Sequence, residues 1–131
     1  MAGTQRHNLA VTGQKLFAVA ASAALGLWLI VRAPLPLVPT WWVAGESDYS
    51  DPWKKRHRMA DWLVLSRSLL GSTREEVISL LGGPPKTGKF TDWDLVYVLG
   101  AQRGLFSIDS EWLVLRFDRS GHAVDARIMR D

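Results

Sequence analysis

The longest apolar run of the chain covers residues 16–31 and contains no charged residue. As a helix it would rise about 24 Å, and the long side chains of Lys15 and Arg32 extend it toward the hydrocarbon core, which is about 30 Å thick. The pattern predicts a cytoplasmic tail over residues 1–15, disordered over 1–8, and a transmembrane anchor over residues 16–32. The alternative is a cleaved secretory signal, but the small residues 21–23 that suit a peptidase lie inside the run.

Prolines alternate with apolar residues over 33–40, which predicts an extended segment that ends the membrane helix. Trp41 and Trp42 follow, and tryptophans beside a span suit either the headgroup interface or a contact with the folded domain. We therefore expect a linker over residues 33–50 and a folded domain over residues 51–131.

The domain is predicted to open with a helix from Asp51-Pro52 to about Arg67, because aspartate suits the N-cap and proline the first helical position. Basic side chains crowd its first turn, where they form either a solvated face or a contact with anionic lipid headgroups. These side chains are Lys54, Lys55, Arg56 and Arg58.

A second helix carries its own start and stop signals. Ser72 and Glu75 have the spacing of a capping box, Val77 and Leu81 fall on one apolar stripe, and Gly82 suits the left-handed residue that ends a helix. A helix of about ten residues is not stable alone, so it must pack on the rest of the domain.

Three later segments alternate apolar and polar residues with period two, which predicts strands. Residues 118–121 form a tight turn, so the second and third strands pair antiparallel. The expected fold class is α+β: an N-terminal transmembrane helix, then a small α-α-β-β-β domain with two helices packed on one face of a three-stranded antiparallel sheet. The expected core is Met59, Trp62, Leu63, Val77, Ile78, Leu81, Leu95, Tyr97, Leu113, Leu115, Phe117, Val124 and Ile128.

Charge and residue types argue against several functions. The net charge is +3, but apart from Arg6, Lys15 and Arg32 the chain has as many acidic as basic residues, so we expect no nucleic-acid partner. There is no cysteine, and the three histidines have no zinc-ligand spacing, so each is expected to be solvated. We expect no cofactor, no metal and no enzymatic activity.

The block of residues 71–84, Gly-x-x-x-Glu-Glu-Val-x-x-Leu-Leu-Gly-x-Pro, with the strands that follow it, resembles the SmpA/OmlA (BamE-like) domain family over residues 55–131. The resemblance implies a binding or scaffolding module on the periplasmic side of the bacterial inner membrane, where it assists envelope or outer-membrane assembly. The layout is also similar to one repeat of the β-lactamase-inhibitor proteins. The alternative function is therefore inhibition of a specific periplasmic enzyme. No sequence feature specifies an oligomeric state.

A contact surface for an envelope protein is expected on the face of the sheet that the two helices leave bare. Apolar side chains with a charged margin suit a protein interface, and Trp112 is its expected anchor. The alternative is that Trp41, Trp42 or the connection over residues 100–110 covers this face. The predicted protein-binding residues are Val96, Val98, Trp112, Val114, Arg116 and Arg127.

Overall fold

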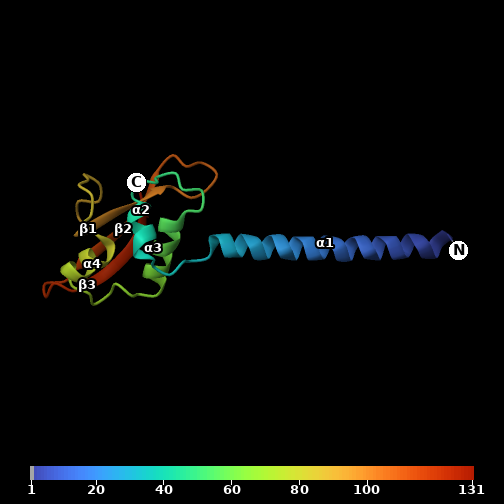
Figure 1. Cartoon of the computed structure of the whole chain (residues 1–131), viewed down its shortest axis with the longest axis horizontal. Coiled ribbons are helices and arrows are strands. Elements are labelled where there is room, and N and C mark those ends of the chain that lie inside the picture. Colours follow the sequence, from blue (N-terminus) through green and yellow to red (C-terminus); the bar gives the residue numbers. More distant parts are fainter. Residues whose placement is uncertain (1) are drawn as a thin grey trace. The chain divides into compact units, whose positions relative to one another are not determined.

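The computed structural model describes residues 2–131 and forms two compact units, which meet between Ala33 and Pro34. The first unit is one helix, α1 (Ala2–Arg32), drawn in blue in Figure 1. Within it, the 21-residue stretch Thr12–Arg32 is long and apolar enough to cross a membrane. Membrane anchors and signal sequences both have this length and composition. The prediction of disorder is wrong for residues 2–8, which form the first turns of α1. Once a helix is nucleated, adding residues to its end costs little free energy, and residues 2–8 include no proline that would stop it.

The second unit is built on a sheet of three antiparallel strands in the order β1-β2-β3. The strands are β1 (Leu95–Ala101), β2 (Ser110–Phe117) and β3 (Ala123–Arg130). The predicted hairpin turn is confirmed: the Gly121 N–H donates to the Asp118 carbonyl at 3.0 Å, and Gly121 has φ 84°. The α+β class and the antiparallel sheet are therefore as expected.

Helices α2 (Pro39–Ala44), α3 (Lys55–Leu65) and α4 (Arg74–Leu81) pack on one face of this sheet (Figure 1). Only two helices were predicted there, and α2 is the additional one. Its Trp42 is fully buried, and the indole N–H donates to the Leu81 carbonyl at 2.9 Å. The predicted linker therefore supplies a central core residue.

Helix α3 begins later than predicted. The Asp51 carboxylate accepts hydrogen bonds from the Trp53 N–H at 3.0 Å and the Lys55 N–H at 2.9 Å, so it caps the segment as expected. The helix itself starts only at Lys55, because Lys54 has a left-handed φ of 50°.

The N-cap of α4 is Thr73, whose hydroxyl accepts a hydrogen bond from the Glu76 N–H at 3.2 Å. The prediction of Ser72 is wrong by one residue. The Ser72 carbonyl accepts a hydrogen bond from the Ala123 N–H at 2.8 Å, so Ser72 is held beside β3 and the helix starts after it. Gly82 ends the helix with a positive φ of 83°, as expected, but its ψ of 172° lies outside the left-handed helical region.

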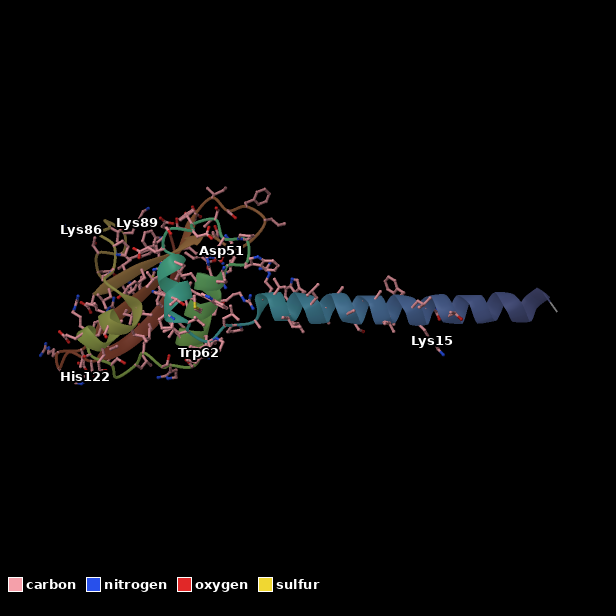
Figure 2. The ribbon with its side chains drawn as sticks, in the orientation of Figure 1. Lys15, Asp51, Trp62, Lys86, Lys89 and His122 are labelled. Atoms are coloured by element: carbon pink, nitrogen blue, oxygen red, sulfur yellow. The ribbon has the colours of Figure 1, made fainter. Side chains whose placement is uncertain are left out.

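The helix-facing core contains every predicted residue except Val124. The β2–β3 register slips between Arg116 and Phe117, which pair with Asp125 and Ala123, so Val124 is the extra residue and is exposed. Ala123 is buried in its place. Figure 2 shows the side chains filling the space between helices and sheet.

Candidate functional site

The sheet face that was expected to be bare is covered by the chain itself. Val114 is fully buried, and Trp112 is 9% exposed beneath Phe90, their ring centroids 6.0 Å apart. The cover comes from the segment between α4 and β1, which also brings Trp93 onto this face. The alternatives expected from the sequence, Trp41, Trp42 and the connection over residues 100–110, do not cover this face.

The margin of this face is accessible. Arg116 and Arg127 are exposed, and their guanidinium groups lie 4.3 Å and 5.9 Å from the centre of the Trp93 ring. Val98 is half-buried and Val96 is buried beside a cavity of about 370 Å³ under the covering segment. The six predicted residues therefore share one face, but their expected anchor is not available to a partner.

A second group of polar residues lies where α3 meets the β1–β2 connection, with the buried Glu111 at its centre. Arg103 donates to both carboxylate oxygens of Asp61, one of them at 3.0 Å, and forms an ion pair with Glu111 at 2.9 Å. Arg130 reaches the other Glu111 oxygen at 3.2 Å. Glu111 has no exposed surface, and its charge is balanced by Arg103, which is mostly buried, and by Arg130, whose side chain is exposed.

His57 lies beside this ion cluster and is buried, so the expectation of a solvated histidine is wrong for it. Its Nε2 lies 3.0 Å from the Ala101 carbonyl, to which a neutral ring donates. Burial lowers the pKa of His57 from 6.5 to about 4, although the nearby Glu111 charge opposes the shift. Burial alone would raise the pKa of Glu111, but hydrogen bonds from Arg103 hold it below its usual value. His122 is exposed in the hairpin turn, and the side chain of His7 lies outside the described residues.

The basic first turn of α3 is only partly a surface feature. Arg56 is buried, stacks 4.5 Å from the centre of the Trp42 ring and donates to the Trp42 carbonyl at 3.1 Å. The guanidinium therefore joins α2 to α3, and the expectation of a fully solvated basic face is wrong at this position.

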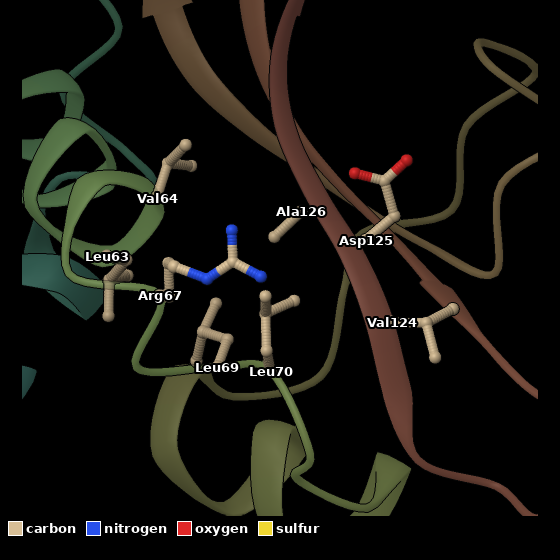
Figure 3. Close-up of a pocket in the computed structure, with 8 residues that line it drawn as sticks. All are labelled: Leu63, Val64, Arg67, Leu69, Leu70, Val124, Asp125 and Ala126. Atoms are coloured by element: carbon tan, nitrogen blue, oxygen red, sulfur yellow. The ribbon is translucent and has the colours of Figure 1, made fainter.

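A groove of about 190 Å³ lies between the end of α3 and β3 (Figure 3). Sequence reasoning missed it, because it assigned residues 66 and 67 to the helix. Six of the eight residues that line it are apolar, but Leu63 and Leu69 are almost completely buried, so most of the surface exposed in the groove is polar. The lining residues are Leu63, Val64, Arg67, Leu69, Leu70, Val124, Asp125 and Ala126.

Arg67 places a positive charge in this groove. It follows α3 with a left-handed φ of 55°, which is uncommon outside glycine. Figure 3 shows its guanidinium directed toward Ala126, while the Asp125 carboxylate lies on the other side of β3. Asp125 is paired with Arg127 at 3.0 Å, and within the described part of the chain no carboxylate forms an ion pair with Arg67.

The groove runs along a free edge of the sheet. β3 pairs with β2 on one side only. On its outer side, Ala123 exchanges hydrogen bonds with Gly71 and Ser72, both at 2.8 Å. Beyond Ala123, no strand among residues 2–131 pairs with this outer edge.

The described residues contain no group of three or more side chains able to hold a metal ion. No protein-family model, curated protein or solved structure matches the chain.

Proposed function

We propose that this chain is a single-pass membrane protein whose domain, residues 34–131, is a non-enzymatic protein-binding module. The partner segment lies in the groove between α3 and β3. On this proposal α1 is the uncleaved anchor, and the domain lies on the periplasmic side of a bacterial inner membrane, as the resemblance to the SmpA/OmlA family implies.

The observation that carries the proposal is the coincidence of three properties in one groove. An outer strand edge offers backbone groups to an extended peptide, and the accessible apolar residues of the lining, Val64, Leu70 and Val124, can contact side chains of that peptide. The Arg67 guanidinium adds a cation that has no ion-pair partner among the described residues. This chemistry suits an extended protein segment that bears an acidic residue or a terminal carboxylate.

The buried ionisable groups support a non-enzymatic role. Asp61 and Glu111 are held by Arg103, and the His57 ring is committed to the Ala101 carbonyl. Neither the groove nor the cavity beside Val96 is lined by any of these groups. General acid–base catalysis needs such a side chain within hydrogen-bonding reach of a substrate. The carboxylates that do line the groove and the cavity are already bonded: Asp125 pairs with Arg127 at 3.0 Å, and Asp94 accepts a hydrogen bond from the Phe117 N–H at 2.7 Å.

A photo-reactive amino acid at Val124, which is 52% exposed and lines the groove, tests the proposal in native membranes. The expected result is an adduct with an envelope protein, whose identity distinguishes an assembly partner from an inhibited enzyme. Introducing Arg67→Glu should reduce the adduct about tenfold or more, because like charges placed together at an interface repel strongly.

Arg119→Glu is the matched control, since it reverses the same charge in the exposed hairpin turn away from the groove. It should leave the adduct unchanged. If position 124 gives no protein adduct, or if both charge reversals weaken it equally, the groove is not the binding site.

A further inference from the structure

The connection between β1 and β2 ends in an apolar tip. Leu105, Phe106 and Ile108 are 97%, 77% and 85% exposed, which makes them the most exposed large apolar side chains of the domain. Large apolar side chains gathered in this way on a surface usually mark a place of contact with a partner or a membrane. We call residues 104–108 the apolar tip.

The base of the connection is fixed, so the tip is held away from the sheet. The Gln102 N–H donates to the Asp109 carbonyl at 2.8 Å, and the Ser107 hydroxyl donates to the Gln102 carbonyl at 2.9 Å. Arg103, beside the tip, is held by Asp61 and Glu111. These contacts fix the two ends of the connection, and its three large apolar side chains are left exposed to solvent.

The base of the tip lies next to the point where the chain enters the domain. The Leu35 N–H donates to the Arg58 carbonyl at 3.0 Å, and Asp61, three residues further along α3, holds Arg103. Residues three apart are neighbours on a helix surface and differ by about 4.5 Å along its axis. Only the tether, Ala33 and Pro34, separates Leu35 from the end of α1 along the chain, so the base of the tip contacts the part of α3 to which the first residues of the domain are bonded.

Aromatic and basic side chains flank the tip. Tyr49 bonds through its hydroxyl to the Ser110 hydroxyl, and its carbonyl accepts the Ala101 N–H at 3.1 Å. Lys54 donates to the Ala101 carbonyl at 3.3 Å, and the neighbouring Trp53 is exposed. Aliphatic and phenylalanine side chains with tyrosine, tryptophan and lysine beside them are the composition of a surface that rests at the boundary of headgroups and acyl chains.

We propose that the apolar tip inserts Leu105, Phe106 and Ile108 into the interfacial layer of the bilayer that holds α1. This inference rests on the membrane anchor of the proposed function but not on the groove. The tip gives the domain a second attachment to the lipid, and this attachment restricts its rotation about the tether.

The absence of cysteine makes the test direct, because a single introduced cysteine is the only labelling site. The full chain is reconstituted in vesicles of phosphatidylethanolamine and phosphatidylglycerol with an environment-sensitive fluorophore at Phe106→Cys or Leu105→Cys. Both labels are expected to be quenched by spin-labelled acyl chains and protected from aqueous iodide. Ser120→Cys, in the exposed hairpin turn, is the matched control and should show the reverse.

Leu25→Cys, within α1, separates the two proposals. If the label at Leu25 is quenched by acyl chains while those at Leu105 and Phe106 respond to iodide as Ser120 does, the tip inference is overturned and the anchor stands. If the label at Leu25 responds to iodide, the anchor fails, and the inference fails with it. A third result is that the labels at the tip are shielded from both quenchers and lose this shielding when the protein is diluted with lipid. It would indicate that a second copy of the chain covers the tip, and it would overturn the inference.

Discussion

At the scale of single residues, His57 and Gly100 show how closely the end of the sheet is packed. Gly100 has φ 131°, and a Cβ placed there would lie 2.7 Å from the Tyr49 carbonyl oxygen and 3.1 Å from the His57 ring. The absence of a side chain at residue 100 therefore lets the 45–54 segment and α3 approach β1.

We expect acid to destabilise the domain through His57. The native pKa of about 4 lies below the ordinary 6.5, so between these pH values the unfolded chain binds a proton that the native chain does not. The stability is complete above about pH 6.5 and falls as the pH drops toward 4, by about 3 kcal/mol if the whole shift is expressed. Urea unfolding of the full chain in detergent, followed by tryptophan fluorescence at several pH values, measures the slope.

His57→Gln keeps an N–H donor for the Ala101 carbonyl and should flatten this slope, whereas His122→Gln, in the exposed turn, should preserve it. An unchanged slope in His57→Gln would assign the acid sensitivity to another group.

Gly100→Ala should destabilise the domain by about 1–3 kcal/mol, since it adds backbone strain to a close contact with backbone atoms. Gly88→Ala is the control, because a Cβ added at Gly88 would meet no atom within 4 Å and the φ of this residue is ordinary. Thermal unfolding compares the two, and equal melting temperatures would mean that the 45–54 segment yields without cost.

At the scale of elements, the sequence predicted what depends on neighbouring residues and missed what depends on distant ones. The alternation over β1, β2 and β3 and the turn at Gly121 are local patterns, and the structure confirms them. The burial of Trp42 depends on Leu81, 39 residues away, and no local pattern specifies that contact. The cover over Trp112 was missed for the same reason, because Phe90 and Trp93 lie in a segment without periodicity.

Thr73→Ala should lower the stability by about 1 kcal/mol, because the Glu76 N–H at the start of α4 loses its acceptor. Ser72→Ala should have a much smaller effect, since the contacts of Ser72 with Leu69 and Ala123 are made by its backbone. Chemical unfolding of both variants decides which residue is the cap, and a larger loss from Ser72→Ala would favour the cap predicted from the sequence.

Trp42→Phe should cost about 1–3 kcal/mol, because the Leu81 carbonyl at the end of α4 would lose a buried hydrogen bond. Trp41→Phe is a matched control, since Trp41 is half exposed on the same short helix. Equal unfolding midpoints for the two variants would show that the indole N–H contributes nothing to the packing of α2.

At the scale of the whole molecule, the two units depend on different physical signals. The apolar helix was predictable from residue type alone, because the 16 consecutive uncharged and mostly apolar residues 16–31 have few structural alternatives. The groove was not predictable, since it requires Arg67 to leave the helix and β3 to remain at an edge, and both are outcomes of tertiary packing.

The proposed orientation predicts that alkaline phosphatase fused after Asp131 is active, because that enzyme works only outside the cytoplasm. Arg6 and Lys15 before the apolar run, against Arg32 alone at its other end, give a weak bias toward the same orientation, whereas the basic residues between Lys54 and Arg58 favour the opposite one from a distance at which the rule fades. A fluorescent cytoplasmic reporter in the same position serves as the reciprocal control. An inactive phosphatase beside a bright reporter would place the domain in the cytoplasm.

The short connection between α1 and the domain limits the distance from α1 at which the domain can bind a partner. Leu35 is bonded to α3 and Trp42 lies in the core, so along the chain only Ala33 and Pro34 lie between α1 and the first bonded residue of the domain. A folded unit of this length has a radius of gyration of about 13 Å. If α1 spans the membrane as proposed, a partner must come to the same membrane surface, where confinement raises its effective concentration. Such a domain is suited to proteins of its own membrane, and a partner fixed in another membrane lies beyond its range.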